Sequence, residues 1–251
     1  MGVTLNNRVV LITGSTTGLG KAMALEFAHA GARVVMNYHN NQQRAEASFA
    51  ELSALGAPCM LTQSDVTEEQ SVERMYKSIH DTLGPVDILI PNATPAQPQN
   101  PIEDYDWPFY QSMIDFFLKS PYLLTTICLP HMKRQKWGRI INITSEVFSL
   151  GVAPFTAYVA AKGAQVGFSR SLATELASFG ITVNMISPGW IPVERHEKDP
   201  QEVKDMYLAS IPAGRWGLPK DVASAALYLA SEESAFVTGQ TIAVNGGKTF
   251  H

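Results

Sequence analysis

The chain has 251 residues, of which 45% are hydrophobic and 17% are charged, and its formal net charge is −4. This composition is typical of a globular protein with enough apolar residues for a core, and one α/β domain of this length is common. A negative net charge without an extended basic cluster excludes the usual nucleic-acid-binding surface. We therefore expect one domain over residues 1–251 and no nucleic-acid partner.

The sequence lacks the patterns of membrane, secreted and metal-binding proteins. No apolar run approaches the roughly 18 residues that a membrane span requires, and residues 1–4 lead into a predicted strand without a signal-peptide pattern. Cys59 and Cys128 lie in apolar runs without C-x-x-C spacing, which favours core positions in a reducing compartment. The histidines show no metal-ligand spacing. We expect a cytoplasmic protein that contacts no membrane and holds no metal.

A glycine-rich segment follows the first predicted strand, which spans residues 8–13. The segment reads Gly14-Ser15-Thr16-Thr17-Gly18-Leu19-Gly20, and a helical pattern over residues 21–30 comes next. Strand, glycine-rich turn and helix in this order predict a nucleotide site, because the backbone can approach a pyrophosphate at the N–H groups of the helix N-terminus. A purely structural tight turn is the alternative, and the small residues favour binding over it.

The rest of the chain alternates between predicted strands and helices. Further strands are predicted at residues 33–38, 59–63, 86–90, 139–144, 181–186 and 240–245, and helices at 40–55, 68–83, 104–135, 158–179 and 221–230, the last capped by Asp221. Such βαβ repeats predict a parallel sheet with right-handed crossovers. Pro108, Pro121 and Pro130 predict that the stretch 104–135 is at least two helices or one kinked helix. Residues 190–215 are polar and weakly helical, which is typical of a mobile flap.

The end of the second predicted strand indicates the cofactor. An acidic residue at this place binds the ribose 2′-hydroxyl of NAD and repels the 2′-phosphate of NADP. This chain has Tyr38-His39-Asn40-Asn41 there, without a carboxylate. NADP is therefore favoured and NAD is the alternative, although no arginine stands at the strand end to bind the phosphate.

A serine, a tyrosine and a lysine stand at spacings that predict acid–base chemistry. Ser145 follows a predicted buried strand, and ligands of open α/β sheets bind at the carboxyl ends of strands. Tyr158 and Lys162 are four positions apart, so on a helix they share a face and the ammonium favours the phenolate. A solvated lysine near a half-buried tyrosine is the alternative, and the glycine-rich turn favours the catalytic interpretation.

With these motifs in order, the chain resembles the short-chain dehydrogenase/reductase family, most closely its 3-oxoacyl-carrier-protein reductase branch. The resemblance covers nearly the whole chain and rests on residues 13–20, 65–66, 92–93, 145, 158–162, 188–189, 212–215, 237–240 and 245–247. It implies one Rossmann-type doubly wound α/β domain, with a seven-stranded parallel sheet and helices on both faces. It also implies a nicotinamide cofactor and a homotetramer.

The resemblance assigns roles to individual residues. Ser145 would hydrogen-bond the substrate oxygen, Tyr158 would exchange a proton with it, and Lys162 would favour the phenolate and hold the nicotinamide ribose. Asp65 and Val66 would contact the adenine. The implied cofactor-binding residues are Gly14, Thr16, Thr17, Gly18, Leu19, Gly20, Tyr38, His39, Asp65, Val66, Asn92, Ala93, Tyr158, Lys162, Pro188, Gly189 and Ile191.

Two positions depart from the family pattern. Thr94 replaces a glycine beside the nicotinamide, and Phe117 stands where the family has a catalytic asparagine. A phenylalanine side chain forms no hydrogen bond, but Pro121 lacks the N–H that would pair with the Phe117 carbonyl in a helix. That carbonyl could hold a relay water that connects Lys162 to solvent. The alternative, a structural kink with weak activity, is equally open.

We expect an NAD(P)-dependent oxidoreductase that transfers a hydride between the cofactor and a small carbonyl or alcohol substrate with an apolar body. The residues expected near the substrate are mostly apolar: Phe148, Leu150, Val152, Phe155, Trp190 and Trp216. Arg195 and His196 on the flap could meet an anion, although a solvated loop is favoured. One alternative is a cofactor-binding protein with weak or no redox activity because of Phe117. A lyase or dehalogenase without a nicotinamide has the least support, because the phosphate-binding glycines are all present.

Overall fold

One parallel sheet organises the computed structural model, which describes residues 3–250. Within these residues the sheet has seven strands in the order β3-β2-β1-β4-β5-β6-β7. The strands are β1 (Val9–Ile12), β2 (Arg33–Tyr38), β3 (Cys59–Gln63), β4 (Ile88–Ile90), β5 (Gly138–Ile143), β6 (Ile181–Pro188) and β7 (Thr241–Val244). The order reverses between β1 and β4, and ligands of doubly wound sheets bind at the carboxyl ends of the strands at such a point.

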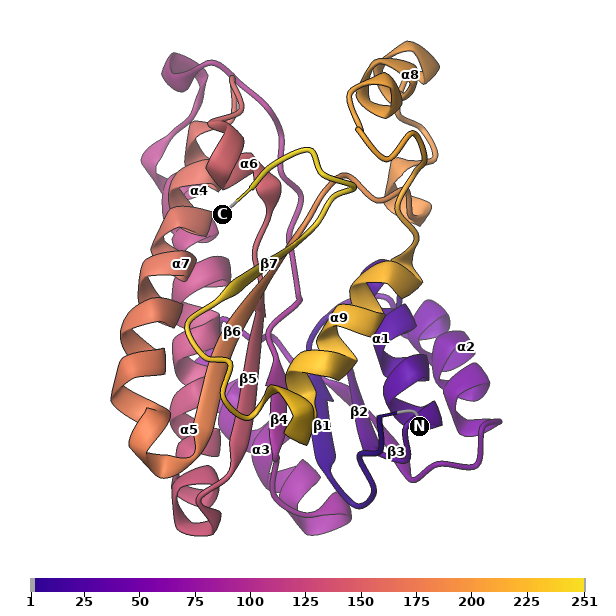
Figure 1. Ribbon diagram of the computed structural model, residues 1–251, viewed down its shortest axis with the longest axis vertical. Coiled ribbons are helices and arrows are strands. Elements are labelled where there is room, and N and C mark those ends of the chain that lie inside the picture. The colour runs from indigo at the N-terminus through magenta and orange to yellow at the C-terminus, as the bar shows by residue number, and fades with distance from the viewer. Residues whose placement is uncertain (1–2, 251) are drawn as a thin grey trace.

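Helices cover both faces of the sheet (Figure 1). Their bounds are α1 (Gly18–His29), α2 (Gln42–Ser53), α3 (Glu69–Leu83), α4 (Trp107–Ile114), α5 (Ser120–Gln135), α6 (Glu146–Leu150), α7 (Thr156–Leu176), α8 (Gln201–Ala209) and α9 (Pro219–Ala230). Val10 and Ile12 of β1 pack in the cluster with α1 and α9, whereas Val9 and Leu11 pack in the cluster with α3, α5 and α7. Because both faces of the central strands are covered, β1 and β4 are continuous apolar runs.

These elements confirm the fold class that the sequence predicts, and β2 and β3 match their predicted ranges. The last helix differs in detail, because it begins at Pro219 and Asp221 is therefore not its cap residue. The Asp221 carboxylate instead accepts the N–H of Leu218 at 2.8 Å from inside the first turn. That N–H precedes the helix and has no partner within it.

The stretch 104–135 divides as the prolines indicate. A π-helical segment, Asp115–Lys119, separates α4 from α5 and ends just before Pro121. In this segment the N–H of Ser120 donates to the carbonyl of Asp115, five residues back. Such widened turns accommodate a residue that cannot continue the ordinary α-helical pattern.

Residues 190–215, expected to form a flap, leave the end of β6 and return to α9. They contain a 3₁₀ turn, Glu194–His196, and the helix α8. In Figure 1 α8 stands beyond the carboxyl ends of the strands, at the upper right. Among residues 3–250, no helix has the length and apolar character needed to cross a bilayer.

Candidate active site

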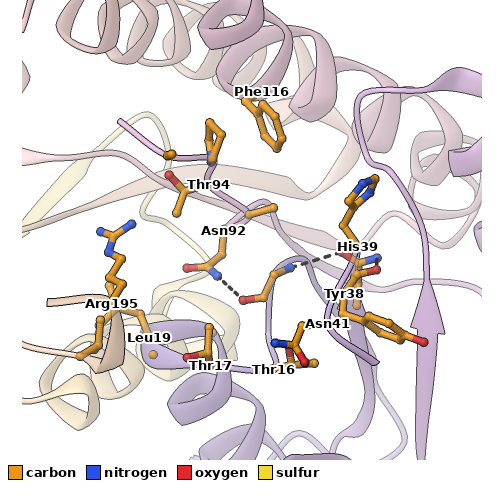
Figure 2. Close-up of a pocket in the computed structure, with 18 of the residues that line it drawn as sticks. Thr16, Thr17, Leu19, Tyr38, His39, Asn41, Asn92, Thr94, Phe116 and Arg195 are labelled. Carbon is orange, nitrogen blue, oxygen red and sulfur yellow. Dashed lines mark hydrogen bonds between the residues drawn. The ribbon is translucent and has the colours of Figure 1, made fainter. Parts of the chain in front are cut away.

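A cavity of about 460 Å³ opens where the order of the strands reverses. The glycine-rich turn, the ends of β2, β3 and β4, and the flap surround it (Figure 2). Its lining includes these predicted cofactor residues: Gly14, Thr16, Thr17, Gly18, Leu19, Gly20, Tyr38, His39, Asp65, Val66, Asn92, Ala93, Gly189 and Ile191. Thr94 also lines it, whereas Tyr158, Lys162 and Pro188 are buried beyond the lining. The sequence thus locates most of one cavity from separate motifs.

The glycine-rich turn needs glycine at Gly18 for its backbone conformation and at Gly20 for lack of space. Gly18 has a φ of +53°, in the left-handed region, and a Cβ on Gly20 would lie 2.5 Å from the carbonyl oxygen of Gly14. Asn92 holds the turn from β4, because its amide donates to the carbonyls of Thr13 at 2.9 Å and Gly14 at 3.1 Å. Figure 2 shows the bond to Gly14. A narrow backbone cradle at the start of α1 is what a dinucleotide pyrophosphate requires.

The same turn binds an anion from within the chain. The N–H of Gly18 donates to the Glu194 carboxylate of the flap at 3.1 Å. Burial raises the pKa of Glu194, but hydrogen bonds from its own backbone, the Thr17 hydroxyl and the Gly18 N–H, together with Lys21, outweigh it and lower the pKa. The N-terminus of α1 therefore favours negative charge, as a site for a phosphate group does.

Next to the end of β2 lies a cation that the sequence did not predict, Arg44 of α2. Asn41 caps α2, since its side chain accepts the N–H of Arg44 at 3.0 Å, and Arg44 lines the cavity with His39. The Nδ1 atom of His39 lies 3.7 Å from the Oδ2 atom of Asp65. Burial raises the pKa of Asp65, but bonds from Thr67 and the nearby His39 outweigh it, so the pKa is lowered. The helical position of Arg44, away from the strand end, gave no signal in the sequence.

Ser145 and Tyr158 meet at the carboxyl end of β5. Ser145 caps the short helix α6, and its hydroxyl accepts the N–H of Val147 at 3.4 Å. Tyr158 is 8% exposed on α7. Burial raises the pKa of Tyr158, while a hydrogen bond with Ser145 and the charge of Arg195 lower it, and the net shift is upward. Ser145 and Tyr158, which separate sequence patterns single out, therefore lie together at this strand end.

The Lys162 ammonium forms its hydrogen bonds with the end of β5 and with Gln165, and its contact with the Tyr158 ring is longer. Its ammonium donates to the carbonyl of Ile143 at 2.7 Å and to the side chain of Gln165 at 3.0 Å. It lies 5.7 Å from the centroid of the Tyr158 ring. Burial, with the charge of Arg195, lowers the pKa of Lys162 well below its ordinary value. The tie to the strand end fixes Lys162 one helical turn from Tyr158.

Phe117 fills the place where the resemblance puts an asparagine. Its ring is 1% exposed and meets the Tyr158 ring edge-on at 5.2 Å. The Lys162 ammonium lies 3.8 Å from the centroid of the Phe117 ring, so the side chain offers a π face in place of a hydrogen bond. The water relay through the Phe117 carbonyl stays a prediction beside this contact.

Contacts next to Ser145 hold the flap in place. Glu146, which follows Ser145, is 3% exposed and accepts a short hydrogen bond from the Tyr207 hydroxyl of α8. The N–H of Trp190 donates to the same hydroxyl at 2.6 Å. The Tyr207 ring stacks on Trp216, with their centroids 5.6 Å apart. We call the Glu146–Tyr207–Trp190 contact the flap latch. Its members are far apart in sequence, and no sequence motif predicts it.

Comparison with known proteins agrees with this geometry. Residues 14–249 match the family described as "Enoyl-(Acyl carrier protein) reductase". The 3-oxoacyl-[acyl-carrier-protein] reductase FabG of Haemophilus influenzae is 39% identical over 245 residues, covering 97% of this chain and 98% of that protein. The (2S)-[(R)-hydroxy(phenyl)methyl]succinyl-CoA dehydrogenase subunit BbsD of Thauera aromatica is 38% identical over 247 residues, which are 98% of each chain.

A solved structure shows the same fold. The crystal structure of levodione reductase superposes with a TM-score of 0.91 at 27% sequence identity, covering 97% of this chain and 98% of the other. The fold, the glycine-rich turn and the relatives point to one conclusion. The chain belongs to the short-chain dehydrogenase/reductase family and is an NAD(P)H-dependent oxidoreductase of that family.

Proposed function

We propose that this enzyme interconverts a carbonyl and an alcohol with NADP as the favoured cofactor, and that Ser145, Tyr158 and Lys162 form its catalytic centre. The observation that carries the proposal is that Ser145 at the end of β5, the buried Tyr158 of α7 and Lys162 one turn further along α7 come together next to the cavity at the glycine-rich turn. The nicotinamide supplies or accepts the hydride when it is bound. Every other step falls to side chains of this chain.

The proton steps follow from the geometry. The Ser145 hydroxyl holds the substrate oxygen, and Tyr158 gives this oxygen a proton in the reduction and takes it back in the oxidation. Because burial raises the pKa of Tyr158, its phenol carries the proton that the reduction needs. Lys162, fixed by Ile143 and Gln165, is placed to hold the nicotinamide ribose and to favour the phenolate in the oxidation.

Charge at the end of β2 supports NADP. The strand ends at Tyr38 without a carboxylate, and Arg44 and His39 line the cavity beside it. An arginine favours the doubly charged 2′-phosphate through charge-assisted hydrogen bonds, whereas the 2′-hydroxyl of NAD gains little from it. We propose that Arg44 binds this phosphate.

An apolar substrate body is supported by the flap side of the cavity. Trp190 and Ile191 line it, and Phe155 packs on Tyr158 with their ring centroids 4.8 Å apart. Trp216 packs on Trp190 with centroids 5.7 Å apart. Phe148 and Leu150 are 42% and 43% exposed. The apolar lining on the flap side therefore comes chiefly from Trp190 and Ile191, with Phe155 packed behind Tyr158.

The oligomeric state and the cellular location are part of the same proposal. We propose a homotetramer in the cytoplasm that acts on a small molecule, with neither nucleic acid nor membrane as a partner. The support is the family resemblance and the net charge of −4. A second candidate function, cofactor binding with weak or no redox activity, is favoured by the Phe117 ring over Lys162.

The first prediction concerns the phenol. Replacing Tyr158 with Phe removes the proton donor, and we expect kcat to fall by about a thousandfold, within the range for general acid–base catalysis. The Kd for NADPH, from fluorescence titration, should change by less than about twofold. Tyr110→Phe removes a hydroxyl from the same aromatic cluster and is the control. Turnover near that of the wild type in Tyr158→Phe would remove this role. NADPH binding by the wild type without turnover on a broad carbonyl panel would favour the second candidate.

The second prediction concerns Arg44. In Arg44→Gln the Kd for NADPH should rise about tenfold or more, which corresponds to ~1.4 kcal/mol, while the Kd for NADH changes by less than about twofold. The 2′-phosphate of NADPH loses its cationic partner in this variant, whereas NADH has no 2′-phosphate and loses no contact. Arg74→Gln, on the exposed surface of α3 outside the cavity, is the control. Equal effects on both cofactors would contradict the assignment.

The third prediction concerns the flap latch. Tyr207→Phe removes the hydroxyl that donates to the buried Glu146 carboxylate and accepts from the Trp190 N–H, so each of these groups loses a hydrogen bond, which costs about 1–3 kcal/mol. We expect KM for the carbonyl substrate to rise more than kcat falls, and acrylamide to quench tryptophan fluorescence more strongly as Trp190 and Trp216 loosen. Adding Glu146→Gln should restore part of the loss, because an uncharged amide is less costly to leave unpaired. Tyr228→Phe, on α9, is the control. A Tyr207→Phe enzyme with wild-type KM and quenching would refute this role.

A further inference from the structure

Arg195 is a charged side chain at the cavity that the mechanism above does not use. It stands in the 3₁₀ turn of the flap and lines the same cavity as Asn92 and Thr94. Figure 2 shows it on the same side of the cavity as Leu19, with its guanidinium raised toward the level of Asn92. The long, flexible Arg195 side chain can therefore contact a ligand on the flap side of the cavity.

The charge of Arg195 acts on both members of the catalytic pair. It contributes to the lowering of the Lys162 pKa and opposes the rise of the Tyr158 pKa that burial causes. Within residues 3–250, no ion pair joins Arg195 or Lys162 to a carboxylate. The neighbouring Glu194 carboxylate is bound to the N–H of Gly18. Arg195 therefore brings to the flap side of the cavity a positive charge that has no ion-pair partner among the described residues.

The hydrogen bond that holds Arg195 is easily exchanged. Its Nε donates to Nε2 of His196 at 3.0 Å, while the N–H of Val193 donates to Nδ1 of the same ring at 3.2 Å. Burial and the charge of Arg195 lower the pKa of His196, which favours the neutral ring. A neutral imidazole accepts through only one nitrogen, so His196 can satisfy one of these donors but not both. A carboxylate would accept from Arg195 without that competition.

We propose that Arg195 binds a carboxylate of the substrate, so that the enzyme acts on oxo acids and the corresponding hydroxy acids. This inference rests on the proposed oxidoreductase function. With the reacting carbonyl at Ser145 and Tyr158, a carboxylate can pair with the guanidinium through two hydrogen bonds. Trp190 and Ile191, which also line the cavity, would face the apolar spacer. In the reduction the carbonyl carbon accepts a hydride from NADPH and the oxygen accepts the proton of Tyr158, which yields the hydroxy acid and NADP⁺.

The experiment compares matched acids and esters. Steady-state NADPH oxidation is measured with acetoacetate and levulinate, each beside its methyl ester, for the wild type, Arg195→Gln and Arg195→Lys. Lys198→Gln, an exposed cation of the same flap that does not line the cavity, is the matched control. The Kd for NADPH is measured for every variant, because a cofactor phosphate is the other anion that Arg195 could meet.

We expect the wild type to show a kcat/KM at least about tenfold higher for at least one acid than for its ester. Arg195→Gln should abolish this preference by raising KM for the acid, with the ester kinetics and the Kd for NADPH within about twofold of the wild type. Arg195→Lys should keep part of the preference, since it keeps the charge but loses the planar fork. Lys198→Gln should match the wild type.

Two results would overturn the inference. One is equal kcat/KM for acid and ester in the wild type. The other is an Arg195→Gln enzyme that loses NADPH binding as much as it loses the acid, which would assign Arg195 to the cofactor. If no carbonyl compound oxidises NADPH, the proposed function fails instead. Calorimetry of levulinate binding to the NADP⁺ complex then decides on Arg195: binding that Arg195→Gln removes supports its role, and absent or unchanged binding refutes it.

Discussion

The hydrogen bond from Lys162 to the Ile143 carbonyl is the contact on which the site depends. It joins α7 to the end of β5 at 2.7 Å, only two residues before Ser145. Tyr158 lies one turn earlier on α7, so the same bond brings the phenol to the serine. Burying an ammonium is costly, and the Gln165 side chain and the Phe117 ring offset part of that cost. Burial still lowers the pKa of Lys162.

Phe117 changes how this centre handles charge. An asparagine at its position would offer a hydrogen bond to the proton path, whereas a ring attracts the ammonium through its π face and can neither give nor take a proton. The π-helical segment before Pro121 sets the backbone at this place. Arg195 brings a positive charge to the cavity side, and the proposed carboxylate of the substrate would balance that charge.

Local pattern and long-range contact explain what the sequence could and could not predict. The glycine-rich turn and β2 were predictable, because apolar runs bounded by glycine and polar residues fix both ends. Arg44 was missed, because a helical residue reaches the cavity only through the cap that Asn41 forms. The latch between Glu146 and Tyr207 joins residues 61 positions apart and follows no spacing rule. The Asp221 cap was wrong, because Pro219 already begins the helix.

The central claim is that Tyr158 exchanges the proton while hydrogen-bonded to Ser145. The pH dependence of alcohol oxidation in the wild type and in Ser145→Ala tests it most directly. Oxidation needs the phenolate, so its rate rises with pH as Tyr158 loses its proton. The bond from Ser145 lowers the pKa of Tyr158, so its removal should move this rise to higher pH in the residual activity of the variant. A rise at the wild-type pH, or at a lower one, would contradict the account.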